Sequence, residues 1–452
     1  MSHTHTPSRR NFLTLSARLA ALGLGSLAVG GSTDVFAANV VPQAPVTDYK
    51  ALVCIYLFGG HDGNNLIVPL ETTQYNRYTA IRGALALGAN KLLTPIAGPN
   101  NTAYALHYGL TDLNPLYNAG QLAVVLNTGL LERPLSQTEY LAGVEAPSNL
   151  FSHSDQTVQA QTGTPKPDGS GWGGRLLDCW GNADTLAAVS LASPALFLQG
   201  KDVGGNAIPP GITLNLNGMN FWPSQESDVR RQMLDSILTQ DGGNMLRATA
   251  NKSMADGLQL AHTLQNAGGS GPSGFPGTAI GKQLQEVARL IQIRSSQGPG
   301  RQVFFVAHQG FDTHSGQDYQ QWALLTDMSK SLSVFHNVIG GLGLGNQVTA
   351  FTQSEFGRTL QPSGSGSDHA WGSHQIVLGG AVQGGIYGQM PTFVLGGPDD
   401  ANNRGVWIPK ISTSQFGATL GRWFGATEQN IGIAFPNLTK FTSSDVGFMN
   451  LG

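Results

Sequence analysis

Three apolar segments of this sequence lead directly into clusters of acids, amides and histidines. Residues 52–58 run into the turn that carries His61, Asp62 and Asn65, residues 302–307 into the segment 308–314, and residues 348–352 into the segment 353–358. Apolar runs of this length are typical of buried strands, and in parallel α/β sheets binding sites form outside the carboxyl ends of the strands. We therefore expect the three strands to bring acids and histidines to one edge of a sheet.

The residue types in these clusters are those that bind divalent metal ions. Asp312 and His314 stand two residues apart, and Asp368, His369 and His374 form a similar group further along the chain. Carboxylate oxygens and imidazole nitrogens suit zinc, manganese and related ions. The same residues can also serve only to hydrogen-bond loop backbone, so one motif alone would indicate structure rather than chemistry. Several motifs together at predicted strand ends favour a metal site.

The elements that must position these residues alternate along the chain. Further strands are predicted at 122–126 and 376–378, and helices at 74–86, 151–163, 172–180, 227–238, 253–265, 282–294 and 318–339. Such alternation predicts an α/β fold with a mostly parallel sheet covered by helices on both faces. Residues 187–277 differ in character and include a glycine-rich stretch, so we predict that they form an insertion or cap on the main sheet.

Composition and charge argue against several classes of partner. The 452 residues carry a formal net charge of −3, and only 12% are charged, against about 25% in typical domains. This balance favours neither a nucleic acid nor an anionic membrane as a partner. Of the two cysteines, Cys54 falls inside the first apolar run, where a buried free thiol is the expected state.

The N-terminal residues have the pattern of an export signal. Ser8 to Leu13 reads Ser-Arg-Arg-Asn-Phe-Leu, a twin-arginine pattern, and an apolar stretch from Leu19 to Gly30 precedes small residues up to Ala37. The apolar stretch is shorter than the roughly 20 residues of a spanning helix, so cleavage near Ala37 is expected instead of anchoring. We predict a signal peptide at 1–37, an α/β domain at 38–452, export through the twin-arginine machinery, a periplasmic or secreted location, and no membrane span after cleavage.

Seven motifs in a fixed order carry a resemblance to a known family. They are SRRNFL (8–13), FGGHDGNN (58–65), SHSDQ (152–156), GWGGR (171–175), GFDTH (310–314), SEFGRT (354–359) and DHAWGSH (368–374). With these motifs the chain resembles, over nearly the whole mature sequence, the exported bacterial family catalogued as domain of unknown function 1501. That family is grouped with the alkaline phosphatase and sulfatase superfamily, whose members hold one or two divalent metals at strand ends and hydrolyse phosphate or sulfate esters.

The resemblance implies a set of metal ligands, and zinc or manganese is the expected ion, with calcium as an alternative. The residue pattern and the resemblance together give the candidates Asp62, Asp312, His314, Glu355, Asp368, His369 and His374, of which the resemblance makes His369 or His374 the last ligand. Asp62 would be the first metal-bridging aspartate of the superfamily, and Asp312 with His314 the next pair, although the superfamily usually spaces that pair more widely. Glu355 stands where an Asp-His pair is expected, and Phe356 takes the place of the histidine. One expected ligand is therefore missing, and two full metal sites are in doubt.

The resemblance also places a nucleophile at the start of a helix that ends in Thr-Gly, and residues 151–163 have that outline. Ser154 could attack phosphorus, and His153 could act as a base or ligand. The alternative for Ser154 is that it only caps the helix. Arg175, Arg358 and Asn65 are the candidate substrate-binding residues. The two arginines are chosen because guanidinium groups match phosphate and sulfate oxygens. They could equally form internal salt bridges.

The sequence thus predicts a metal-dependent hydrolase of phosphate or sulfate esters that acts on a small-molecule or glycan ester. The alternative is an exported binding or assembly protein that keeps the scaffold without the chemistry, and the missing ligand favours it. An oxidoreductase is disfavoured, since the segment 59–63 lacks the Gly-x-Gly-x-x-Gly spacing of a dinucleotide site.

Overall fold

The structure, a computed structural model, describes most of the chain after its first 40 residues. The described residues are 41–44, 46–180, 186–201, 211–214, 229–240, 242–266, 271–294 and 300–451. The predicted signal peptide at 1–37 lies outside them, as do residues 267–270 of the glycine-rich stretch.

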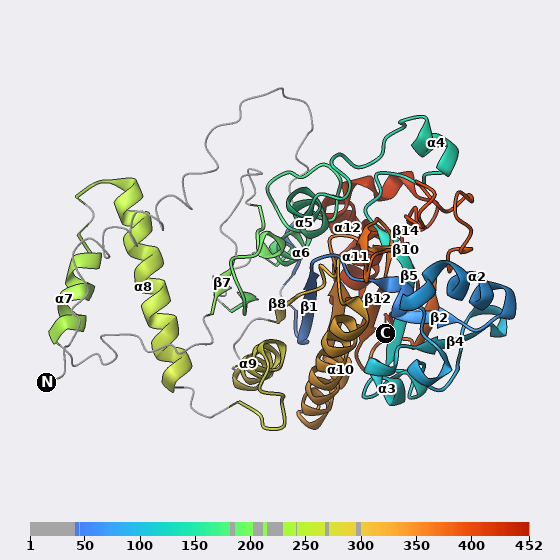
Figure 1. Cartoon of the computed structure of the whole chain (residues 1–452). Helices are drawn as coiled ribbons and strands as arrows, with labels where there is room; N and C mark the ends of the chain where they lie inside the picture. The colour runs from blue at the N-terminus through green and yellow to red at the C-terminus, as the bar shows by residue number, and fades with distance from the viewer. Residues whose placement is uncertain are drawn as a thin grey trace, which may run out of the picture. The chain divides into compact units, whose positions relative to one another are not determined.

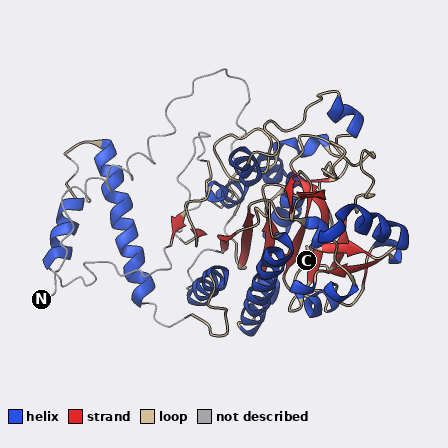
Figure 2. Ribbon diagram, viewed as in Figure 1, coloured by secondary structure: helices blue, strands red, loops and turns tan. Residues whose placement is uncertain are grey.

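A sheet of nine strands forms the centre of the fold, with helices around it (Figures 1 and 2). The strand order is β13-β5-β12-β9-β1-β8-β6-β7, and β14 pairs with β5. The strands are β1 (Lys50–Phe58), β5 (Leu122–Gly129), β6 (Ala188–Ser190), β7 (Ile212–Thr213), β8 (Arg301–Gln309), β9 (Val348–Gln353), β12 (Ser373–Leu378), β13 (Gly385–Tyr387) and β14 (Ile411–Ser412). The predicted α/β class with a mostly parallel sheet is confirmed.

Strand β12 is antiparallel to both of its neighbours, β5 and β9, whereas the other described pairs of this sheet are parallel. Because β12 runs in the opposite sense, its first residue, Ser373, pairs with Thr128 near the end of β5. The segment before β12 therefore lies at the edge where the parallel strands end. For this reason the histidine motif 368–374, which leads into β12, can meet the motifs that follow β1, β8 and β9.

Helices cover both faces of the sheet, and the alternation of side chains along β1 shows how. Ala51, Val53 and Ile55 are buried in one core with apolar residues of α9 (Ala279–Ile293) and α10 (Gln317–Gly341). Leu52 and Cys54 belong to the opposite core, which includes residues of α5 (His153–Thr162), α6 (Trp172–Asp178), α11 (Thr413–Phe424) and α12 (Glu428–Ala434). Each large apolar side chain fully buried here contributes about 1.5–3 kcal/mol. Both cysteines are buried and unpaired, as expected for Cys54.

Smaller elements flank the ends of the central strands. They are β2 (Ile67–Pro69), β3 (Ile96–Ala97) and β4 (Ala103–Leu106), which form a three-stranded sheet; the hairpin of β10 (Arg358–Ser363) and β11 (Gly366–His369); and the helices α2 (Thr72–Arg82), α3 (Asn114–Asn118) and α4 (Gln137–Leu141). The hairpin follows β9 directly and leads into β12. It thus places the last histidine motif beside the end of the sheet.

The segment predicted as an insertion or cap, 187–277, begins within the main sheet. Strands β6 and β7 extend that sheet next to β8, so any inserted part starts only after residue 214. Its described helices are α7 (Val229–Leu238) and α8 (Met245–Asn266). No helix in the described part of the chain has both the length and the apolar character that crossing a bilayer requires.

Candidate metal centre

Three histidines from different elements converge on one carboxylate oxygen. Asp312 follows β8, His153 is the first residue of α5, and His369 ends β11. From Asp312 Oδ1 the Nε2 atom lies 3.0 Å away in His314, 3.4 Å in His369 and 3.5 Å in His153. The Nε2 atoms of His314 and His369 are 3.0 Å apart. Among the described residues, the ligand atoms of His153, Asp312 and His369 all lie within 4.8 Å of one another, and those of His314, Asp368 and His369 form a second such group that shares His369.

The hydrogen bonds of two of these rings fix which nitrogen faces the cluster. His153 Nδ1 is 3.0 Å from Glu355 Oε1, and His369 Nδ1 is 2.8 Å from the carbonyl oxygen of Phe151. Since a carbonyl oxygen can only accept, His369 Nδ1 is the donor, and Nε2 keeps its lone pair in the neutral ring. A carboxylate oxygen as partner selects the same tautomer for the neutral ring of His153. An imidazole held in this way is the usual arrangement of a metal ligand. Consistent with that role, His153 Nε2 is buried and makes no hydrogen bond.

Glu355 lies behind His153 and not among the converging Nε2 atoms. Its buried carboxylate contacts His153 through Nδ1, accepts the Gly59 N–H at 2.8 Å and the Ser354 hydroxyl at 3.2 Å. The sequence predicts Glu355 as a ligand, whereas this position suits a carboxylate that orients one. Phe356 packs against the rings of His153 and His369 with both centroid distances at 4.8 Å, so the residue that replaces the expected histidine forms an apolar wall.

Close backbone approaches hold the strand ends together. Gly59 has φ +119°, and a Cβ atom there would lie 2.2 Å from the backbone nitrogen of Asp312. Gly60 has φ +82°, and its Cβ would lie 2.3 Å from the ring of Phe356. Only glycine permits both the positive φ and the contact. The Gly-Gly turn after β1 is thus required for the loops after β8 and β9 to meet.

The side chain of Arg358 links these loops. Its buried guanidinium donates to Asp312 Oδ1 and to the carbonyl oxygens of Gly59 and Gly60, the last at 2.9 Å, and to that of Ser367 at 2.9 Å. Arg358 was predicted to grip a substrate anion. Its donors are instead used within the protein, as in the salt-bridge alternative.

The charges of the centre shift three pKa values. Partial burial opposes ionisation of Asp312, but the hydrogen bond and the charge of Arg358 outweigh it and lower the pKa of this carboxyl. Burial lowers the pKa of His369, whereas the hydrogen bond to Glu355 raises that of His153. Asp312 is therefore ionised and His369 neutral at neutral pH, which is the state in which both bind metal.

The family model described as "Protein of unknown function (DUF1501)" matches residues 49–403, most of the chain. This chain belongs to the DUF1501 family. No curated protein matches its sequence. The matched residues include every predicted site residue and the whole of the centre described above.

Among the other ligands predicted for this DUF1501 protein, Asp62 lies in a buried ion pair. Its carboxylate pairs with the guanidinium of Arg82 and accepts hydrogen bonds from Asn64, whose backbone N–H is 3.1 Å away, and from Gln317. Burial raises the pKa of Asp62 and outweighs the charge of Arg82. The guanidinium of Arg82 and the N–H groups of Asn64 and Gln317 thus satisfy the Asp62 carboxylate within the protein.

The two remaining candidates occupy different environments. Asp368 lies beside the centre, because one of its oxygens lies within 4.8 Å of ligand atoms of His314 and His369, and its carboxylate pairs with Arg404 at 3.1 Å. His374 is buried, and its Nδ1 accepts the Asn127 N–H at 2.9 Å. Burial lowers the pKa of His374 to about 4. Among the described residues, His374 belongs to neither of the two clusters of three ligand side chains at the centre.

The predicted substrate-binding residues Arg175 and Asn65 are both buried and saturated. Arg175 donates to the carbonyl oxygens of Ala434, Ser170 and Thr162 and to the Ser170 hydroxyl, which uses all five guanidinium donors. Asn65 bonds the carbonyl of Leu85 and accepts from Tyr78 and Arg82. Both side chains therefore serve the internal structure.

The N-terminus of α5 carries the nucleophile candidates. Ser152, not Ser154, is the N-cap, since its hydroxyl accepts the Asp155 N–H at 3.4 Å, and Gly163 ends the helix with φ 70°. Ser154 is exposed and lies 3.1 Å from Ser152 Oγ. The helical segment predicted at 151–163 is confirmed. Ser154 does not cap this helix.

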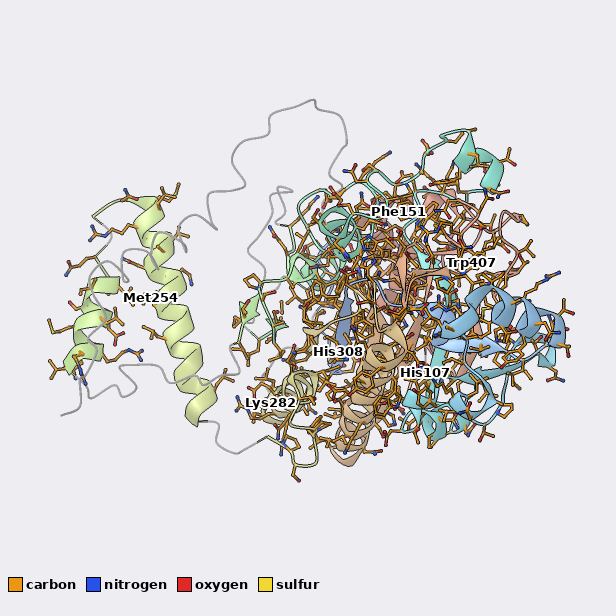
Figure 3. All side chains as sticks on the ribbon, viewed as in Figure 1. His107, Phe151, Met254, Lys282, His308 and Trp407 are labelled. Carbon is orange, nitrogen blue, oxygen red and sulfur yellow. The ribbon has the colours of Figure 1, made fainter. Side chains whose placement is uncertain are left out.

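Sequence reasoning missed Phe151 and Arg82. Phe151 (Figure 3) has φ 73°, an unusual value for a bulky residue, and this conformation presents its carbonyl to His369. No residue pattern identifies a backbone carbonyl as a partner. Arg82 could have been noticed as a cation inside an otherwise weakly charged sequence.

Proposed function

We propose that this DUF1501 protein is an exported metal-dependent hydrolase of phosphate or sulfate esters. The observation that carries the proposal is the meeting of three imidazole Nε2 atoms at Asp312 Oδ1. The proposed ligands are His153, Asp312 and His369, which form one group, with His314 3.0 Å from Asp312 Oδ1 and Asp368 beside it in a second group that shares His369.

The spacing of these atoms fits a small divalent ion. Zinc bonds to nitrogen and oxygen are 2.0–2.2 Å long, and at tetrahedral angles this separates neighbouring ligand atoms by about 3.3 Å. The separations of 3.0, 3.4 and 3.5 Å from Asp312 Oδ1 agree with that value. A nitrogen-rich set favours zinc over calcium, which takes six to eight oxygen ligands, and manganese, which also suits oxygen ligands, is the second choice.

A bound ion would polarise an ester oxygen and lower the pKa of a water or hydroxyl nucleophile. Neighbouring side chains would then hold the ligands in position and limit access of water. Glu355 keeps His153 Nδ1 protonated, Arg358 holds Asp312 in place, and Phe356 limits water on one side of the rings. Ser154, exposed at the start of α5, is the candidate nucleophile. His153 is the alternative as base only where the ion is held by the other ligands, because its Nε2 cannot bind the ion and accept a proton at once.

The ester class rests on the motif order, which resembles the alkaline phosphatase and sulfatase superfamily. The expected substrate is a small-molecule or glycan ester. The Arg-Arg pattern at residues 9–10 supports export by the twin-arginine route to a periplasmic or secreted location.

The test combines metal analysis with hydrolysis of 4-nitrophenyl phosphate, bis(4-nitrophenyl) phosphate and 4-nitrophenyl sulfate. The variants are Asp312→Asn and His369→Gln, with His336→Gln on α10 as a matched control outside the centre. We expect near-stoichiometric metal and turnover in the parent and the control, and loss of both in the two variants. A parent that takes up no zinc or manganese after reloading would overturn the proposal.

The second candidate is a non-catalytic binding protein on the same scaffold. The specific observation in its favour is that Arg175 and Arg358 have their donors used within the protein, so no predicted arginine is free to hold an anionic ester. Stoichiometric metal without turnover of any of the three esters would favour this candidate.

A further inference from the structure

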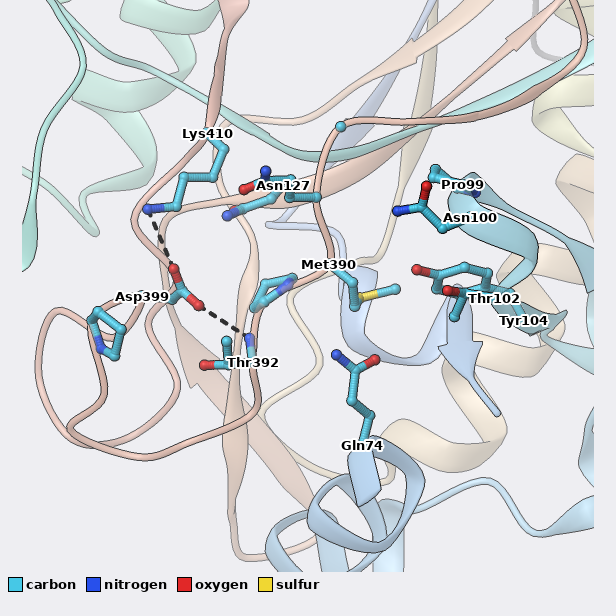
Figure 4. Close-up of a pocket in the computed structure, with 14 residues that line it drawn as sticks. Gln74, Pro99, Asn100, Thr102, Tyr104, Asn127, Met390, Thr392, Asp399 and Lys410 are labelled. Atoms are coloured by element: carbon cyan, nitrogen blue, oxygen red, sulfur yellow. Dashed lines mark hydrogen bonds and ion pairs between the residues drawn. The ribbon is translucent and has the colours of Figure 1, made fainter. Parts of the chain in front are cut away.

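A cavity outside the histidine centre is built from six separate parts of the chain. It has a volume of about 390 Å³ and is lined by residues of α2, the turn before β4, the end of β5, and the loops 388–392 and 398–399 with Lys410 (Figure 4). This volume is in the range of small-molecule sites. None of its lining residues is a ligand of the proposed metal centre.

The polar groups of the cavity include four uncharged carboxamides, beside the hydroxyl groups of Thr102, Tyr104 and Thr392. Among the described residues, the side-chain amides of half-buried Gln74 and of exposed Asn100 and Gln389 have no protein hydrogen-bond partner and face the cavity opening. Each carboxamide can both donate and accept. These three side chains therefore match a ligand whose groups also do both, as hydroxyl groups do.

The charged groups of the cavity cancel each other. Lys410 Nζ is 3.3 Å from Asp399 Oδ1, and Asp399 Oδ2 accepts the Thr392 N–H at 3.1 Å (Figure 4). Both charges thus have partners in the protein, and no unpaired charge remains to select an ion. A neutral ligand fits this lining better than a phosphate, a carboxylate or an amine.

Apolar surface completes the lining. Met390 and Tyr104 lie within it, together with three prolines, Pro99, Pro391 and Pro398. An apolar surface beside several carboxamides suits a ring that has C–H groups on its faces and hydroxyls at its edge. From this combination we infer that the cavity is a binding site for a neutral sugar unit, separate from the metal centre.

The backbone offers a matched pair of variants for the test. Asn100, which lines the cavity, has φ 55°, and Asn101, which does not, has φ 57°. Glycine adopts both conformations without strain, so Asn100→Gly and Asn101→Gly each remove one exposed carboxamide and keep the turn. Gln389→Ala provides a second change on a different segment of the lining.

The experiment measures binding of glucose, N-acetylglucosamine and maltose to the full chain by saturation-transfer NMR and calorimetry, with glucose 6-phosphate and glucosamine as charged comparisons. We expect at least one neutral sugar to bind more tightly than its charged counterpart. Loss of a hydrogen bond in Asn100→Gly and in Gln389→Ala should weaken that binding roughly three- to tenfold, and Asn101→Gly should not weaken it.

Three results would overturn the inference: no binding of any neutral sugar up to its solubility limit, tighter binding of a charged sugar, or equal affinity in Asn100→Gly, Gln389→Ala and the parent. Because the cavity shares no residue with the metal centre, the measurement is made equally well on metal-free protein. A failure here is therefore distinct from a failure of the proposed hydrolase.

Discussion

The pairing of Asp62 with Arg82 ties the turn after β1 to the end of α2. Arg82 is fully buried, and besides its contact with Asp62 it donates to the carbonyl oxygens of Thr359 and Leu360 at 2.8 and 3.0 Å. Removing one member of a buried pair leaves the other charge uncompensated, which costs far more than the pair itself contributes. Asp62 therefore has a structural role that does not depend on a metal.

This role gives a first prediction. Asp62→Ala should lower the free energy of unfolding by about 3–5 kcal/mol in metal-free protein, measured by urea denaturation in excess chelator. The double variant Asp62→Ala, Arg82→Met should recover part of that loss, because it removes the unpaired charge. If Asp62 acts as a ligand instead, the single variant will be as stable as the parent without metal and will differ from it only when metal is present.

A second prediction concerns Glu355, whose side chain is 1% exposed. Glu355→Gln should weaken metal affinity 10- to 100-fold, the usual effect of losing a carboxylate that orients a ligand, without abolishing binding. Competition with a fluorescent chelator measures the affinity. Glu286→Gln on α9, which breaks an ion pair with Arg289 away from the centre, is the control. Complete loss of metal in Glu355→Gln, equal to that in Asp312→Asn, would instead mark Glu355 as a ligand.

At the scale of elements, the centre depends on three connections that leave the sheet at one edge. The Gly-Gly turn after β1, the loop after β8 and the β10–β11 hairpin must approach within van der Waals contact. The third of these connections reaches the edge because β12 is antiparallel to its neighbours. A small backbone change in one connection should therefore disturb the others.

Gly59→Ala tests this dependence. The added Cβ would lie 2.2 Å from Asp312 N, and φ is +119°, so we expect destabilisation of about 1–3 kcal/mol together with weaker metal binding. Gly83→Ala is the matched control, because φ is +56° there but no atom lies within 4 Å of the added Cβ. Thermal unfolding and metal content would be compared for both. Equal effects of the two substitutions would show that the contact with the Asp312 loop is unimportant.

Several elements were predictable from the sequence because their pattern is local. The apolar runs at 302–307 and 348–352 became β8 and β9, and the pattern at 318–339 became α10. The direction of β12 was not predictable, since a short apolar run has no signal for the neighbour it will pair with. Strands β6 and β7 were missed within 187–277 because they have only three and two residues.

At the scale of the whole molecule, the α/β class and the edge that carries the histidines could be predicted, because alternation along the chain and the parallel sheet rule together determine them. The residues that pair with the buried charged side chains could not be predicted. Asp62 meets Arg82 across 20 residues, and Arg358 meets Asp312 across 46, and neither spacing leaves a periodic signal. The sequence also could not distinguish a metal ligand from a residue that orients a ligand, since both are carboxylates in the same loops.

The molecule as a whole buries several histidines in their neutral form, and this should make it sensitive to acid. Burial lowers the pKa of His107 to about 4, and that of His61 to about 3. In the unfolded chain both have a pKa near 6.5. Below pH 6.5 the unfolded chain therefore binds protons that the folded chain does not, so the free energy of unfolding falls as the pH drops from about 6.5 toward 4, by up to about 1.4 kcal/mol per pH unit for each such histidine.

His107 offers a variant that isolates one of these groups. Its Nδ1 accepts the Gly109 N–H at 2.9 Å, which a protonated ring could not do. His107 is the N-cap of the 3-10 turn Tyr108–Leu110. Asparagine keeps an acceptor at this position and does not titrate, so the free energy of unfolding of His107→Asn should fall less steeply between pH 6.5 and 4 than that of the parent. Urea denaturation at intervals of pH, in excess chelator so that metal does not contribute, measures the slope for parent and variant. If the two slopes are the same while the variant folds normally at pH 7, His107 is not a source of the acid sensitivity, and the remaining buried histidines must account for it.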